Sequence, residues 1–131
     1  MIFAKEQPLK TAYVLPIVVL WLVVFVAYNN IVSAGFVGDD LTVVVGNDSI
    51  KSIRSVLEMF YKSYWKDRPE LGLYRPVTAF TYAINYFVGG LNPSVYHLFN
   101  LLLHAVNTTL FYLLSLQCTQ KVKLAFAASL L

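Results

Sequence analysis

The sequence predicts an all-α membrane protein: two transmembrane helices, a long outer loop that contains amphipathic or interfacial helices, and the start of a third span. Three observations support this fold class. Of the 131 residues, 58% are hydrophobic and 13% are charged, with a mean hydropathy of +0.63, whereas soluble domains have about 45–50% apolar and about 25% charged residues. Residues 11–38 and 76–120 contain no charged side chain. Six of the 10 Lys and Arg residues and six of the 7 acidic residues lie between Asp39 and Arg75.

The first predicted transmembrane helix covers residues 12–30. Its core, Ala12–Tyr28, contains 11 Val, Leu, Ile or Phe residues, each of which contributes roughly −0.3 to −0.6 kcal/mol at the centre of a membrane helix. The sum, about −3 to −7 kcal/mol, is enough for insertion. A cleaved signal peptide stays open as an alternative, with Lys5 and Lys10 as its basic start and Val32–Ala34 as its cleavage site. The apolar segments further along the chain favour a retained helix.

The second apolar region divides into two predicted helices. Residues 76–88 begin with Pro and end before Gly89 and Gly90, and their length of about 20 Å is too short for a hydrocarbon core of about 30 Å. We expect this helix to lie in the interface or to re-enter the membrane. Residues 94–117 reach about 36 Å and form the second predicted span. The apolar residues 122–131 are expected to begin a truncated third span.

Basic residues beside the two spans set the predicted orientation. Lys5 and Lys10 precede the first span, and Lys121 and Lys123 follow the second. Short flanks that carry Lys and Arg are retained in the cytoplasm. The sequence therefore predicts a multi-pass integral membrane protein with a cytoplasmic N-terminus, whose loop of residues 31–93 is periplasmic or luminal.

The outer loop, residues 31–75, contains an acidic pair and a helical pattern. Apolar residues recur on one face of residues 49–64, which predicts an amphipathic helix. This helix either lies along the membrane surface or packs against other parts of the loop. Asp39 and Asp40 come shortly after the first span. By themselves, they are compatible with a solvated turn and with an active site at the membrane surface.

Polar residues form a stripe along the second span. His97, Asn100, His104 and Asn107 recur at steps of three and four residues and so share one helical face. Because polar groups are costly in hydrocarbon, this face is expected to meet other helices or a water-filled cavity. Hydrogen bonding between helices is one interpretation, and a role for His97 at a sugar-phosphate site is the other.

Two blocks of the chain resemble a known family. The first is DDLTVVVGN, residues 39–47, and the second is YRPVTAFTYAINYFVGGLNPSVYHLFNLLLHAV, residues 74–106. In this order they resemble the N-terminal part of the polytopic protein O-mannosyltransferases that carry tetratricopeptide repeats, bacterial relatives included, which belong to the GT-C class of glycosyltransferases. The match departs at Gly38, where relatives commonly have an aromatic residue. The resemblance implies an N-terminal fragment, inactive alone, whose partners are the remaining transmembrane helices of the parent protein.

The resemblance also implies a reaction, in which mannose or a similar sugar passes from a polyprenyl-phosphate donor to a Ser or Thr hydroxyl of an acceptor protein. Asp39 and Asp40 match the acidic residues of the family's catalytic loop. A general base raises the reaction rate by about 10²–10⁴-fold. Because neighbouring side chains of an extended segment point to opposite faces, only one of the two carboxylates can serve as that base. We assign Asp39 as the base and Asp40 as an orienting group. Arg75 and His97 are the candidate ligands of the donor phosphate.

The sequence says less about cofactors and about alternative functions. No cofactor is implied, and a divalent cation held by the acidic pair is an option, although two carboxylates are too few ligands for a closed site. The net charge of +3 without a basic cluster gives no support to nucleic-acid binding. Two alternatives stay open: a small two-span interaction protein without catalytic activity, and a GT-C enzyme that acts on lipids or polysaccharides.

Overall fold

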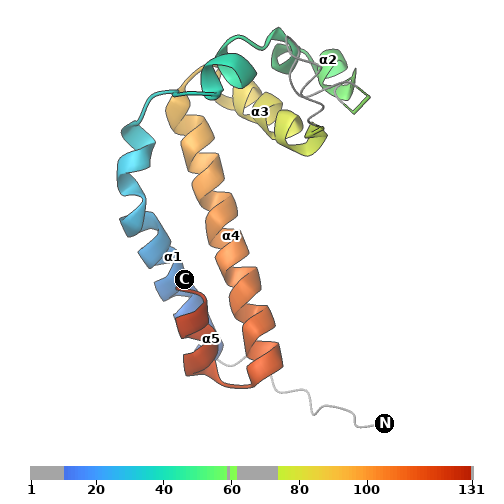
Figure 1. The fold of residues 1–131 in the computed structure, drawn as a ribbon. Coiled ribbons are helices and arrows are strands. Elements are labelled where there is room, and N and C mark those ends of the chain that lie inside the picture. The colour runs from blue at the N-terminus through green and yellow to red at the C-terminus, as the bar shows by residue number, and fades with distance from the viewer. Residues whose placement is uncertain (1–10, 59, 62–73, 131) are drawn as a thin grey trace. The chain divides into compact units, whose positions relative to one another are not determined.

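The computed structural model describes residues 11–58, 60–61 and 74–130, and every regular element in these residues is helical (Figure 1). The all-α class predicted from the sequence is therefore confirmed for this part of the chain. The chain divides into two compact units, one made of residues 1–29 and 100–131 and the other of residues 30–99. The elements in chain order are α1 (Thr11–Ala27), η1 (Asn29–Ser33), η2 (Leu41–Val45), η3 (Asp48–Lys51), α2 (Ile53–Glu58), α3 (Pro76–Gly89), α4 (Pro93–Thr119) and α5 (Val122–Ala128).

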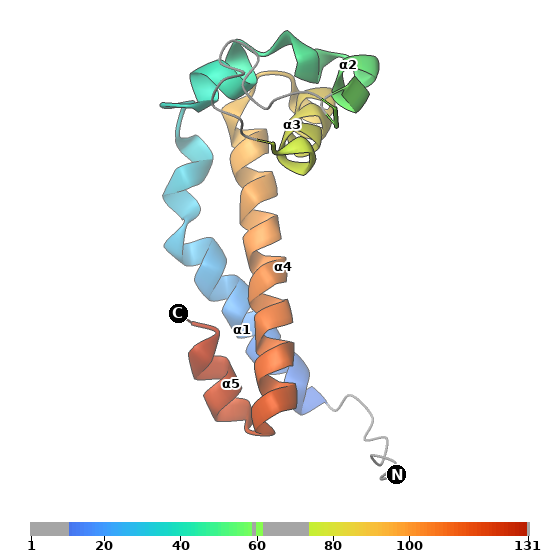
Figure 2. The same cartoon turned by 45° about the vertical axis from the view of Figure 1, so that its right-hand side comes forward.

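The first unit packs α1 and α5 against the later part of α4 (Figure 1, Figure 2). Leu20, Tyr112 and Ala125, one residue from each helix, form a fully buried cluster. A hydrogen bond also joins two of the helices, because Trp21 Nε1 donates to Thr109 Oγ1 at 2.8 Å. The unit is therefore held by apolar packing and by one polar contact between α1 and α4.

Length and composition separate α4 from the other described helices. Within the described residues, α4 alone is long and apolar enough to cross a membrane, with 27 residues and a hydropathy of 1.4. The apolar helix α1 has 17 residues, about 25 Å, which is less than a hydrocarbon core of about 30 Å. Of the two predicted spans, the structure supports the second, and the first stays a prediction. The continuation of α5 as a third span also stays a prediction.

In the second unit, Pro and Gly residues determine where α3 ends and α4 begins. Pro76 occupies the first turn of α3, and Gly90 ends the helix with φ +61° while its N–H donates to the carbonyl of Tyr86 at 2.7 Å. Asn92 Oδ1 then accepts from the backbone N–H of Ser94 at 3.1 Å, within the first turn of α4. The sequence predicts helices over residues 76–88 and 94–117, and α3 and α4 cover both ranges.

The amphipathic helix predicted over residues 49–64 is not continuous in the structure. A 3₁₀ turn, η3, ends at Lys51, Ser52 has an extended backbone, and α2 covers Ile53–Glu58. Ile50, in η3, is fully buried in the core of this unit. Residues 59 and 62–64 lie outside the described residues.

Candidate active site

The acidic pair lies in a helical turn rather than in the extended segment that the sequence suggested. Gly38 has φ +57°, a conformation that favours glycine, and reverses the chain just before the pair. The carbonyl of Asp39 then accepts from the backbone N–H groups of Thr42 and Val43, both at 2.9 Å. Asp40 is the N-cap residue that directly precedes the π-helical turn η2. The expectation of an extended backbone at the pair is therefore wrong, while the separate roles of the two side chains stay a prediction.

The two carboxylates have different surroundings within this turn. Asp40 is half-buried, and its Oδ2 accepts a long hydrogen bond from the N–H of Val37 at 3.4 Å, while its own N–H donates to the Val37 carbonyl at 3.2 Å. Asp39 is exposed, and its carboxylate makes no hydrogen bond or ion pair within the part of the chain that the structure describes. One carboxylate is thus engaged by the loop and the other is open to a ligand.

Apolar packing anchors the turn that carries the pair. Val43 and Val44 are 4% and 1% exposed, and they form a cluster with Ile50, Ala83 and Tyr96. These last three residues come from η3, α3 and the first turn of α4. The acidic loop therefore packs against the helices of its own unit. Burial of Val43 and Val44 explains why a run of valines adopts a helical turn.

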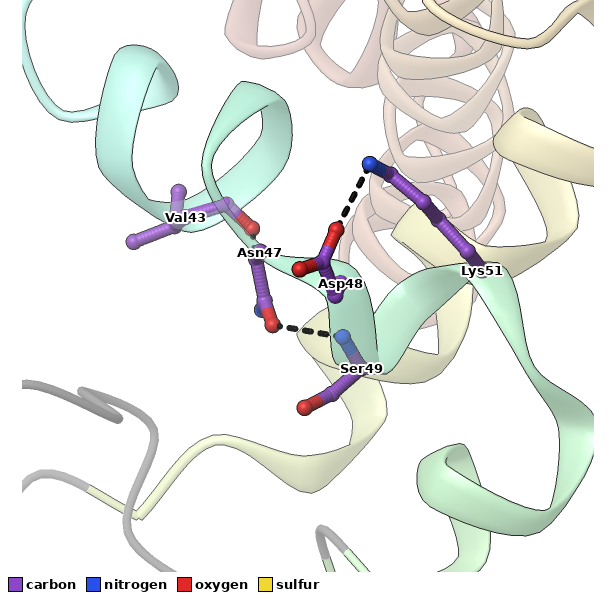
Figure 3. A network of polar contacts seen from close by, with 5 residues as sticks. All are labelled: Val43, Asn47, Asp48, Ser49 and Lys51. Carbon is purple, nitrogen blue, oxygen red and sulfur yellow. Dashed lines mark hydrogen bonds and ion pairs between the residues drawn. The ribbon is translucent and has the colours of Figure 1, made fainter.

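Asn47 connects η2 to η3 through both ends of its amide (Figure 3). Nδ2 donates to the carbonyl of Val43 at 3.2 Å, and Oδ1 accepts from the N–H of Ser49 at 3.1 Å. The residue is 8% exposed. Asn47 belongs to the first block of the family pattern, and Asn directly before a helical turn is also a capping signal. Beside it, Lys51 Nζ donates to Asp48 Oδ1 at 2.7 Å on the surface.

The other two predicted site residues lie on neighbouring elements of the same unit. Arg75 is exposed and directly precedes α3, and its carbonyl accepts from the N–H of Ala79 at 3.1 Å. His97 lies in the second turn of α4 and is half-buried, with its Nε2 buried and without a hydrogen-bond partner among the described residues. All four predicted residues therefore belong to the unit of residues 30–99. Within the described ranges, no three His, Cys, Asp or Glu side chains are grouped to hold a metal ion.

Two members of the polar stripe on α4 line a cavity in the first unit. His104 and Asn107 face a cavity of about 610 Å³ that residues of α1 and α5 also line. The ring of His104 also makes an edge-to-face contact with Tyr28, with 5.4 Å between the ring centroids. The sequence predicts that this polar face meets a cavity or other helices, and the structure places a cavity there.

Comparison with known proteins gives relatives that carry one functional name. Protein O-mannosyl-transferase Tmtc1 of Drosophila melanogaster is 34% identical over 95 residues, which cover 70% of this chain and 11% of that protein. Protein O-mannosyl-transferase TMTC2 of Homo sapiens is 35% identical over 88 residues, which cover 64% of this chain and 10% of that protein. This chain is similar in sequence to the protein O-mannosyl-transferases. The resemblance predicted from the sequence is therefore confirmed.

The extent of these matches bears on the site. Protein O-mannosyl-transferase F38B6.6 of Caenorhabditis elegans is 30% identical over 113 residues, which cover 81% of this chain and 16% of that protein. A match over 81% of the 131 residues covers about 106 residues of this chain. Wherever a continuous match of that length begins, it includes the residues from about 26 to about 106. That stretch contains Asp39, Asp40, Arg75 and His97.

The matches are limited in two ways. The chain spans 10–16% of the length of the three relatives named here. No family model matches the chain, and no solved structure matches it significantly.

Proposed function

We propose that residues 1–131 form the acidic-loop region of a membrane glycosyltransferase that transfers mannose, or a similar sugar, from a polyprenyl-phosphate donor to a Ser or Thr hydroxyl of a protein. The observation that carries this proposal is the similarity to proteins named protein O-mannosyl-transferases over a stretch that includes the acidic loop. The loop's π-helical turn adds support, because such turns are frequent at functional sites.

In the proposed reaction, Asp39 acts as the general base. The acceptor hydroxyl oxygen attacks the anomeric carbon of the donor sugar while its proton passes to the Asp39 carboxylate. The bond between that carbon and the phosphate oxygen breaks, and polyprenyl phosphate leaves with the bonding electrons, so that the sugar configuration inverts. The carboxylate of Asp39 is exposed and has no hydrogen bond or ion pair to a residue that the structure describes, which suits this role. The engaged carboxylate of Asp40 suits an orienting role.

The donor phosphate is proposed to bind Arg75 and His97. A guanidinium can contact two phosphate oxygens at once, and Arg75 is exposed at the start of α3. The Nε2 of His97 is buried and without a partner in the described residues, and buried polar atoms of this kind are usually satisfied by a ligand, a water molecule or another group. A phosphate oxygen would satisfy it.

The proposed site lies at the outer surface of the membrane. In this topology α1 and α4 span the bilayer, the N-terminus is cytoplasmic, and the acidic loop is periplasmic or luminal. The helix α3 then lies in the interface, since its exposed side chains include a large apolar set: Val77, Phe80, Ile84, Phe87 and Val88. A surface helix with such a face inserts it at the boundary between headgroups and acyl chains. A lipid-linked donor would reach the acidic loop from the same boundary.

The test is a matched set of substitutions in the complete polypeptide, assayed for sugar transfer from polyprenyl-phosphate mannose to a Ser- and Thr-containing peptide. Asp39→Asn removes the base and is expected to lower kcat by about 10²–10⁴-fold. Asp40→Asn keeps a side-chain oxygen that can accept the hydrogen bond from the N–H of Val37. Its kcat is expected to fall less than that of Asp39→Asn. Asp48→Asn, on the surface beside Lys51, serves as the control and is expected to keep full activity. Full turnover in both Asp39→Asn and Asp40→Asn would show that the base is elsewhere.

A further inference from the structure

We propose that Asn47 is a positioning residue, which holds the backbone of the acidic turn so that the Asp39 carboxylate lies where the acceptor hydroxyl arrives. This inference rests on the proposed function, because it assigns Asn47 a role through the base. It follows from the contacts of Asn47, which neither binds substrate in the proposal nor carries a charge.

A continuous set of hydrogen bonds runs from Asn47 to Asp39. Asn47 Nδ2 donates to the carbonyl of Val43 at 3.2 Å, and the N–H of Val43 donates to the carbonyl of Asp39 at 2.9 Å. At its other end, Asn47 Oδ1 accepts from the N–H of Ser49 at 3.1 Å, which fixes the amide against η3 (Figure 3). Rotation of the Asn47 side chain would therefore break its hydrogen bond to Val43, the residue whose N–H donates to the carbonyl of Asp39.

The chemistry of the side chain fits this role. Asn supplies a donor and an acceptor on one short amide, whereas Asp supplies acceptors only when ionised and Ser carries a single hydroxyl. Asn47 is 8% exposed and packs beside the apolar cluster that contains Val43 and Ile50. A buried polar group that is fully hydrogen-bonded rigidifies and specifies its surroundings. Both ends of this amide are used, so that the turn has one defined geometry.

Asp39 depends on the backbone more than Asp40 does. The Asp40 carboxylate is held by the N–H of Val37, but the Asp39 carboxylate has no hydrogen bond within the described residues and takes its place from the turn alone. Misplacement of a reacting group by about 1 Å can cost about 10²-fold in rate. Loss of the Asn47 contact is therefore expected to lower kcat rather than to weaken donor binding.

The test measures kcat and KM of Asn47→Ser and Asn47→Asp in the complete polypeptide, with polyprenyl-phosphate mannose as donor. Asn47→Asp keeps an acceptor for the Ser49 N–H and loses the donor to the Val43 carbonyl. Asn47→Ser replaces the two separate amide atoms with one hydroxyl oxygen on a shorter side chain, which cannot occupy both of their positions. We expect kcat to fall by about 10–100-fold, with the donor KM unchanged. The control is Asn92→Asp, the same substitution at an exposed Asn that also accepts from a backbone N–H two residues on, at 3.1 Å. It is expected to keep the wild-type kcat.

A double substitution separates positioning from a general structural effect. If Asn47 acts through Asp39, then Asn47→Ser causes no further loss of kcat in the Asp39→Asn background, since the base is already absent. An equal fold-loss in both backgrounds, or a wild-type kcat for both Asn47 variants, overturns the inference. If the Asn47→Asp protein does not fold, the smaller uncharged Asn47→Ser carries the test. Full activity of Asp39→Asn would refute Asp39 as the base, and full activity of both Asp39→Asn and Asp40→Asn would refute the catalytic role of the acidic pair in the proposed function. An impaired Asp39→Asn with fully active Asn47 variants refutes only the role of Asn47.

Discussion

The close approach of Gly89 to Val95 allows a stability prediction for the turn between α3 and α4. A Cβ placed on Gly89 would overlap Val95 Cγ2 and lie 3.1 Å from Val95 Cβ. Val95 cannot move aside easily, because a β-branched side chain on a helix is nearly confined to one rotamer and this one packs against the core cluster of its unit. Overpacking of this kind costs about 1–3 kcal/mol. Replacing a helical Gly with Ala stabilises a helix by about 1 kcal/mol, so Gly89→Ala is expected to destabilise the turn by up to about 2 kcal/mol.

Native-state hydrogen exchange in detergent micelles measures this local effect at two backbone amides. The N–H of Gly90 donates to Tyr86 and the N–H of Val95 donates to Asn92, and their opening free energies report the stability of the turn. Val95→Ala removes both Cγ methyl groups, so Gly89→Ala in that background is expected to be nearly neutral. Equal losses in both backgrounds, or slower exchange in Gly89→Ala alone, would refute the reasoning.

Two further predictions concern polar contacts in the two units. Thr109→Val removes the acceptor of the Trp21 indole N–H. It is expected to cost about 0.6–1.7 kcal/mol in unfolding free energy, the range for hydrogen bonds between membrane helices, with a shift in Trp fluorescence. The control is Thr108→Val, whose hydroxyl donates to the His104 carbonyl in its own helix, and equal effects in both variants would contradict this role. The hydrogen bond to Asp48 raises the pKa of Lys51 above its ordinary 10.5, so this pair contributes its stability below pH 10.5 and loses it as the pH rises through the raised pKa. Unfolding measured against pH should show this loss in the wild type and not in Lys51→Gln, and identical profiles would contradict it.

The helices of the second apolar region could be predicted from the sequence because their ends have strong local signals. Pro76 begins α3, Gly89 and Gly90 end it, and Pro93 begins α4. Proline fixes φ and lacks the N–H that the interior of a helix needs, whereas glycine readily adopts the positive φ that ends a helix, and both properties are intrinsic to the residue. The sequence bounds therefore agree with the structural bounds to within two residues at each end.

The conformation of the acidic loop could not be predicted in the same way. Runs of β-branched residues such as Val43–Val45 favour extended backbone, yet the structure has a π-helical turn there. The deciding contacts are burial of Val43 and Val44 against residues about 40 to 50 positions later in the chain and the amide of Asn47. The first of these contacts is long-range, so local propensity does not contain it. The candidate site residues could be selected by resemblance, but the difference between the carboxylates of Asp39 and Asp40 required the structure.

The hydrogen bonds of the acidic turn have a consequence for how the loop can diverge during evolution. Apart from the Asn47 amide and the Asp40 carboxylate, they join main-chain atoms, which every non-proline residue supplies. Leu41 and Thr42 are exposed on this turn, whereas Val43 and Val44 face the core. Positions 41 and 42 can therefore exchange side chains freely while the turn keeps its shape. Substitutions at these two positions would alter the chemistry of the surface around the acidic pair without displacing the backbone that carries Asp39.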